Sequence, residues 1–321
     1  MEQEQKLKKK KKKRKLPVLL LGIIAFLLAA YPYISNKSFE MATDSTINTV
    51  RKEMEDNAEK YAAEIEAARE YNSRLSGYRI NLSSLSGNGT EDDGTGLDYD
   101  ELLDMTSDGA MGYITIPAID VNLLVYHGQS EEVLKKGIGH IKGTSLPVGG
   151  EGTHTVLTGH TGLSSAKLFT DLNKLEEGDI FVLNIAGEHF AYEVDQIKIV
   201  DPEDTSDLAI VEGKDYCTLV TCYPYGINSH RLLVRGERTE YVEEAVEEAK
   251  GTKTASSQWM SEYTKALLIS AGLFILGLLF IFITRKLKDR KRKRKALKEG
   301  KKRKLQELSK ERKNGTHNDD P

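Results

Sequence analysis

Two apolar runs divide this chain of 321 residues and leave one long segment between them for a folded domain. They cover residues 17–34 and 266–284, and the second has nineteen residues without a charge. That length crosses a hydrocarbon core of about 30 Å at about 1.5 Å per residue. The first run either spans the membrane too or is the core of a signal peptide cleaved near Ala29-Ala30.

Strongly basic tails lie beyond both apolar runs. Residues 1–16 carry nine Lys/Arg and two Glu, and residues 285–321 carry seventeen Lys/Arg and six Asp/Glu. The stretch between the tails holds 20 basic and 41 acidic side chains, so the formal net charge of −3 hides three differently charged segments. Such basic runs could bind nucleic acid. Because each one adjoins an apolar run, we instead expect two cytoplasmic tails and an extracytoplasmic middle segment at the cell membrane.

The first part of that middle segment, residues 35–110, predicts a helix followed by a loop. Apolar residues recur at three- and four-residue steps over 43–74, the pattern of a helix that packs along a larger body. Residues 76–97 are rich in Ser, Gly, Asn and Asp and predict a mobile loop.

Residues 111–238 predict a compact, mainly β domain. Short β-prone runs alternate with turn residues, which is typical of a sandwich or a closed barrel. Two short helices are expected at 131–136 and 165–175, and an acidic stalk over 239–265 leads to the second apolar run. The expected strands are 112–116, 121–126, 154–159, 180–185, 189–200, 216–222 and 230–236.

Cys222 is the strongest candidate for a nucleophile. It ends the β-prone run Thr218-Leu219-Val220-Thr221-Cys222 and is followed at once by Tyr223-Pro224-Tyr225-Gly226, which places the thiol at a loop mouth. Arg231 lies in the next apolar run, and a nearby cation favours the reactive thiolate. A buried, inert cysteine is the alternative; we expect that state for Cys217.

A cysteine nucleophile also needs a proton shuttle, for which His160 is the best placed histidine. It follows the apolar run Thr155-Val156-Leu157 and stands between Gly159 and a Thr161-Gly162 turn. His230 is second, but it adjoins Arg231 on a strand, so the two side chains face opposite ways. We expect His127, His140, His154 and His189 to be ordinary turn or surface residues, and no metal-binding spacing is present.

Several of these segments resemble the sortase family. They are residues 157–162 around His160, the stretch Thr218–Cys222 and residues 228–236 around Arg231. Residues 111–117 and 143–150 resemble more closely the class C, pilus-assembling sortases of Gram-positive bacteria, and the likeness covers roughly residues 100–238.

The resemblance implies a closed sortase-type β-barrel with a catalytic Cys222, His160 and Arg231. It implies cleavage of an LPxTG-like sorting signal between Thr and Gly through a Cys222 thioester, with His160 as general acid and base. Arg231 would stabilise the oxyanion or position the peptide. A Lys amine of another pilin subunit would then resolve the thioester, and no cofactor or metal is expected.

One departure concerns the lid that covers the cysteine in many pilus sortases. Its Asp-Pro-aromatic motif is absent in the usual form, because no proline lies between Pro32 and Pro117. Asp98-Tyr99 occupies a comparable place, and two interpretations stay open: a reduced lid with Tyr99 against the site, or an ordinary loop.

Three other functions were weighed. A housekeeping sortase that attaches proteins to peptidoglycan is disfavoured by the C-terminal apolar run and the N-terminal helix. A non-enzymatic adhesin or stalk protein predicts an unreactive Cys222. A wall-anchored sortase substrate is excluded, because residues 239–265 contain no LPxTG motif.

Overall fold

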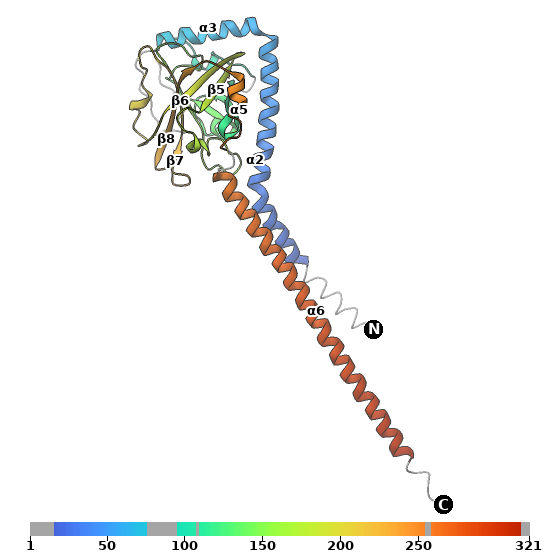
Figure 1. Ribbon diagram of the computed structural model, residues 1–321. Helices are drawn as coiled ribbons and strands as arrows, with labels where there is room; N and C mark the ends of the chain where they lie inside the picture. The colour runs from blue at the N-terminus through green and yellow to red at the C-terminus, as the bar shows by residue number, and fades with distance from the viewer. Residues whose placement is uncertain (1–15, 76–94, 107–108, 254–257, 316–321) are drawn as a thin grey trace, which may run out of the picture. The chain divides into compact units, whose positions relative to one another are not determined.

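The computed structural model describes residues 16–75, 95–106, 109–253 and 258–315 (Figure 1). The basic tail before Leu16 and most of the predicted mobile loop lie outside this part of the chain. The chain divides into two compact units, one formed by residues 30–264 and the other by residues 1–29 together with 265–321.

The first unit contains a closed β-barrel, as the sequence predicts. Around the barrel the strands follow the order β1-β2-β3-β4-β7-β8-β6-β5. Neighbours pair antiparallel except β2 with β3 and β4 with β7, which run parallel. All seven expected strands are present. The bounds are β1 (Ala110–Ile116), β2 (Val121–His127), β3 (Ile138–His140), β4 (Thr153–Thr158), β5 (Ile180–Ile185), β6 (Glu188–Val200), β7 (Asp215–Tyr223) and β8 (His230–Thr239).

The short helices match the sequence only in part. Helix α4 (Glu131–Lys136) is confirmed, and the Ser130 hydroxyl caps it by accepting the Val133 N–H at 3.3 Å. The helix expected at 165–175 is wrong, because Leu168 takes a left-handed φ of 42° that interrupts a right-handed helix. The remaining helical pieces are α5 (Glu243–Glu248) and the 3-10 turns η1 (Tyr99–Glu101), η2 (Pro117–Ile119), η3 (Leu172–Lys174) and η4 (Ser206–Leu208).

The helical stripe over 43–74 is confirmed as a buried face, but it belongs to two helices. Helix α2 (Leu16–Asp56) starts well before the predicted bound, and α3 (Ala58–Arg74) turns sharply across the barrel (Figure 1). Asn57 separates them with a non-helical backbone, and its amide donates to the Glu53 carbonyl at 2.9 Å. The buried members are Ile47, Val50, Met54, Tyr61, Ile65, Ala68 and Tyr71.

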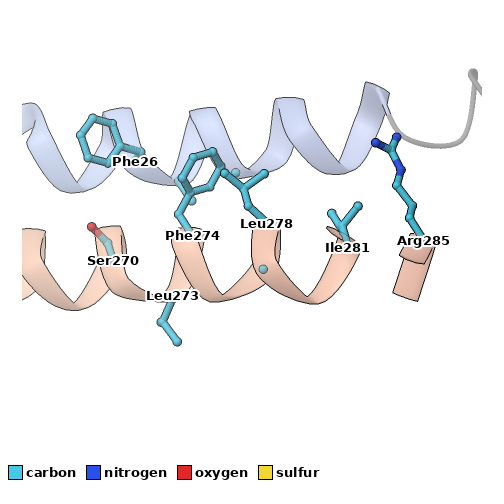
Figure 2. A pocket seen from close by; sticks show the side chains of 10 residues that line it. Phe26, Ser270, Leu273, Phe274, Leu278, Ile281 and Arg285 are labelled. Atoms are coloured by element: carbon cyan, nitrogen blue, oxygen red, sulfur yellow. The ribbon is translucent and has the colours of Figure 1, made fainter. Parts of the chain in front are cut away.

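The second unit contains the start of α2 and, from Lys265 onward, the helix α6 (Gln258–Gly315). Among the described residues one helix, Thr264–Gln306, is long and apolar enough to cross a membrane, and an 18-residue stretch of it has a mean hydropathy of 2.8. It includes the predicted run 266–284. A cavity of about 550 Å³ with mainly apolar walls lies between α2 and α6 (Figure 2). Gly22 permits this close approach, since a Cβ there would lie 2.6 Å from Phe274 Cε2.

Asn72 locks α3 onto the barrel and allows a stability prediction. Its amide accepts the Leu146 N–H at 2.7 Å and donates to the Leu146 carbonyl at 3.1 Å, both out of contact with solvent. Asn72→Ala leaves the buried Leu146 N–H without its partner, whereas the Leu146 carbonyl still accepts from the Val148 N–H at 2.8 Å and the Thr155 hydroxyl at 3.3 Å. We expect this loss to lower the free energy of unfolding by about 1–3 kcal/mol. Thermal unfolding of the detergent-solubilised chain, followed by circular dichroism, measures this. Ser73→Ala, at the exposed neighbouring position, is the control, and equal melting temperatures would contradict the lock.

Candidate functional site

Cys222 and Arg231 face each other across two neighbouring strands. In the antiparallel ladder of β7 and β8, Cys222 lies directly opposite Arg231, so their side chains leave the same side of the sheet. The preceding residues Thr218–Thr221 are buried, which fixes this end of β7 in the barrel wall. The structure therefore brings together the thiol and the cation that the sequence singled out.

His160 reaches the same end of the barrel through β4. This strand pairs parallel with β7 with Thr158 beside Val220, and the next N–H, of Gly159, donates to the Val220 carbonyl at 3.1 Å. The Thr221 hydroxyl donates to the Gly159 carbonyl at 2.7 Å. His160, two residues beyond Thr158, thus stands level with Cys222, two residues beyond Val220.

Gly159 lets the backbone pass close to Ile138 and Phe169 just before His160. A Cβ at this position would lie 2.6 Å from Ile138 Cδ1 and 2.8 Å from Phe169 Cδ2. Neither neighbour has room to withdraw, because both are fully buried. Glycine is therefore required for this approach, and the histidine is carried on closely packed backbone.

A cavity of about 190 Å³ opens beside Cys222. Its walls come from the connection between β4 and β5, from the end of β7, from the loop that follows it and from Leu232 of β8, and hydroxyl and amide groups predominate. Sequence analysis missed Thr170 and Asn173, because their connection was expected to be a helix. The lining residues besides Cys222 are Thr161, Thr170, Asn173, Thr221, Tyr223, Pro224, Tyr225 and Leu232. The larger cavity of Figure 2 contains neither a thiol nor a histidine.

Burial keeps Cys222 and His160 mostly neutral. It raises the pKa of the Cys222 thiol above 9.0, and the positive charge of Arg231 partly opposes this. Burial lowers the pKa of His160 below 6.5, with Glu131 acting in the opposite direction and Lys135 adding to the decrease. At neutral pH the main form is consequently a thiol beside a neutral imidazole.

Arg231 retains an unused donor. It is 8% exposed, and its Nη1 donates to the carbonyls of His230 at 3.1 Å and Asn228 at 3.4 Å. Its buried Nε has no hydrogen-bond partner among the described residues. A buried N–H without an acceptor is costly, so it can gain from a carbonyl oxygen brought by a ligand.

The other histidines have different partners. His230 bonds Ser229 Oγ at 2.8 Å and lies 3.7 Å from Asp201, facing away from Arg231 as the strand alternation predicts. His140 and His154, expected in turns or at the surface, are instead buried and hydrogen-bonded. Burial lowers the pKa of His140 to about 3. Cys217 is fully buried, as expected.

The Asp98-Tyr99 pair lies at one end of the segment suggested as a lid. Asp98 caps η1 by accepting the Asp100 N–H at 3.1 Å. Tyr99 is 2% exposed; its hydroxyl bonds His140 Nδ1 at 2.8 Å and accepts the Gly128 N–H at 3.0 Å. Neither residue lines the cavity beside Cys222. Their role in a lid stays a prediction.

No group of three or more His, Cys, Asp or Glu residues able to hold a metal ion occurs in the described part of the chain. The three candidate groups at neighbouring strand ends are a thiol, an imidazole and a guanidinium, and Cys222 adjoins a cavity lined by hydrogen-bonding side chains. This set suits acyl transfer through a covalent thioester, which needs a nucleophile, a proton shuttle and a donor for the oxyanion.

Comparison with known proteins identifies the barrel. Residues 114–239 match the Sortase domain family. Sortase D of Bacillus subtilis is 34% identical over 132 residues, and Sortase A of Bacillus anthracis is 31% identical over 127 residues. Each match covers 40% of this chain, and the chain spans less than two thirds of these relatives, 64% and 59% respectively.

Solved structures extend the likeness beyond the barrel. Sortase C-1 of Actinomyces oris is 45% identical with a TM-score of 0.52, over 56% of this chain and 99% of that one. Sortase C of Streptococcus pneumoniae is 40% identical with a TM-score of 0.55, over 61% and 97%. With the family match and a Cys-His-Arg geometry at the ends of three strands, these similarities show that the chain belongs to the sortase family of cysteine transpeptidases.

Proposed function

We propose that this protein cleaves an LPxTG-like sorting signal between Thr and Gly and joins the Thr carbonyl to a pilin Lys amine, so that pili are polymerised. The observation that carries the proposal is the pairing of Cys222 with Arg231 next to a polar cavity, with His160 at the end of the adjoining strand. The class C assignment is supported by the similar solved structures, one of which is Sortase C1 of GBS Pilus Island 1, 40% identical over 94% of that chain.

The chemistry follows from the roles we assign to the three side chains. A proton passes from the Cys222 thiol to His160, and the thiolate attacks the Thr carbonyl carbon. The Arg231 Nε–H donates to the oxygen as it becomes negative. The imidazolium then gives its proton to the leaving Gly nitrogen, and a thioester remains. A Lys amine attacks this thioester, His160 accepts its proton, and an isopeptide bond forms as the thiolate leaves.

We further propose that residues 17–34 form a second span, so that both termini are cytoplasmic and the barrel is extracytoplasmic. The basic tails, residues 1–16 and 285–321, adjoin the two apolar runs at the ends far from the barrel, which supports this orientation. Such an anchor would keep the enzyme at the surface where pilin subunits emerge.

Transfer to peptidoglycan is the second candidate function. It is favoured by 30–31% identity to Sortase A of Bacillus anthracis, Streptococcus agalactiae and Listeria monocytogenes. The two candidates share the thioester and differ in the amine that resolves it. The choice of acceptor amine therefore separates them.

Intact-mass analysis after incubation with an LPxTG peptide tests the chemistry. We expect the chain to gain the mass of the peptide up to Thr, because the Gly portion leaves when the thioester forms. Cys222→Ala should gain nothing, whereas Cys217→Ala, at a fully buried thiol, should behave as the wild type. A Lys-containing pilin peptide should then release the adduct faster than a peptidoglycan-type amine. The reverse order would favour wall anchoring, and no adduct with a freely alkylated Cys222 would contradict the substrate class.

The pH dependence of kcat/KM gives an independent prediction. We expect a bell shape with an acid limb below pH 6.5, set by His160, and an alkaline limb above pH 9.0, set by Cys222. The reaction needs the form of the enzyme in which His160 is an imidazolium and Cys222 is a thiolate. At pH values between the two limbs this form is a small fraction of the enzyme, because the pKa of the thiol is higher than that of the imidazole.

Arg231→Gln tests the assignment of the alkaline limb. Removing the positive charge that lowers the pKa of Cys222 should move this limb, and the pH profile of iodoacetamide labelling, to higher pH. The acid limb should not move. A shift of the alkaline limb to lower pH, or none, would show that Arg231 does not stabilise the thiolate.

A further inference from the structure

Asn36 is a buried polar residue on α2 with a contact far along the chain. It is 4% exposed, and its Oδ1 accepts the backbone N–H of Lys167 at 2.7 Å. Its Nδ2 donates to Glu40 Oε1, one turn further along α2, at 2.7 Å. Because a carboxylate only accepts, Glu40 fixes which side of the amide faces the barrel. The side chain is thus oriented to hold a backbone group of the connection between β4 and β5.

The turn that Asn36 holds, residues 167–171, lies against the backbone of the catalytic histidine. The N–H of Phe169, a fully buried residue, donates to the His160 carbonyl at 3.1 Å. The Thr170 hydroxyl accepts the Gly162 N–H at 3.1 Å and also lines the cavity beside Cys222. The same turn therefore contacts the chain at His160 and two residues beyond it, and it forms part of the cavity wall.

This turn needs support from outside itself. Leu168 has a left-handed φ of 42°, a conformation that costs a non-glycine residue on the order of 1–3 kcal/mol. Lys167 is anchored by its side chain as well, with Nζ 2.6 Å from the Ile119 carbonyl and 3.2 Å from Asp171 Oδ2. The contact with Asn36 fixes the backbone immediately before the strained residue.

We propose that Asn36 is a positioning residue of the transpeptidase: through Lys167 and Phe169 it sets the place of His160 relative to Cys222. Asn36 touches none of the reacting groups and acts only through the turn. The proposal rests on the proposed function, and it gives α2 a role in positioning His160. Position 36 lies two residues beyond the apolar run 17–34, so the part of α2 that contacts the barrel begins where that run ends.

Asn36→Ala in the full chain in detergent tests the proposal. We expect kcat for peptide cleavage to fall by about ten- to a hundred-fold, the range for a small misplacement of a catalytic group. Because burial lowers the pKa of His160, a loosened turn that admits water should raise this pKa toward 6.5 and move the acid limb upward. The charged groups that act on the imidazole, Glu131 and Lys135 of α4, stay in place. Histidine NMR titration, assigned with His160→Gln, measures the same shift without turnover.

The chain offers a rescue and two controls. Asn36→Asp combined with Glu40→Gln exchanges the acceptor and the donor of the pair, so the introduced carboxylate still accepts the Lys167 N–H and the charge is conserved. This double variant should recover kcat and the acid limb. Asn36→Asp alone sets two carboxylates against each other and should stay impaired. Glu40→Gln alone keeps an acceptor for Asn36 Nδ2 but no longer fixes the orientation of the amide, so it should be impaired no more than Asn36→Ala. Ser38→Ala, at an exposed position on α2, should match the wild type.

The outcomes separate positioning from mere stability. Melting temperatures of all variants are measured first, and assays are made where each is folded. An unchanged kcat and an unchanged His160 titration in Asn36→Ala would overturn the proposal. So would a fall in kcat with an unmoved titration and no rescue, which indicates a structural role alone. A wild-type chain that never forms the thioester would instead refute the proposed function, while the NMR titration would still judge Asn36.

Discussion

The parallel pairing of β4 with β7 is the constraint on which the site depends. Parallel strands end on the same side of a sheet, and here the register sets His160 beside Cys222 although 62 residues separate them in sequence. The antiparallel pairing of β7 with β8 then places Arg231 opposite the thiol. Three strand ends thus supply three functional groups. A change of one residue in either register would turn a group to the other face.

Loop backbone at this site is held by side chains that bond to main-chain groups. Thr221 holds the Gly159 carbonyl, Asn36 holds the Lys167 N–H, and Asn72 holds both backbone groups of Leu146. Each bond is buried or largely buried, where an unpaired partner would be costly. The connections around the barrel therefore gain rigidity without secondary structure of their own. The same enclosure leaves the thiol and the imidazole mostly neutral at rest.

The strands and the candidate site residues could be predicted from the sequence, because both depend on local pattern. Alternating β-prone runs bounded by turns gave seven strands, and the apolar run ending at Cys222 indicated a thiol at a strand tip. Strand β3 was missed because three residues, Ile138–His140, show no periodicity. The helix expected at 165–175 failed because contacts with His160 and α2 impose the left-handed Leu168. The helix break at Asn57 and the place of Thr170 and Asn173 in the cavity wall could likewise not be predicted, because both depend on tertiary contacts and not on local pattern.

The hairpin between β7 and β8 combines a regular strand ladder with an exposed loop. The ladder from Tyr216 to Tyr223 fixes Cys222 against Arg231, whereas residues 226–229 are exposed and lie outside the ladder, where the Asn228 carbonyl accepts from Arg231 Nη1 at 3.4 Å. Tyr225, in the same connection, forms part of the cavity wall. The exposed residues of this loop can therefore change without altering the pairing of Cys222 with Arg231, provided that the Asn228 carbonyl stays in place. Proteins with the same barrel can thus differ in this part of the cavity wall while keeping the same register of β7 and β8.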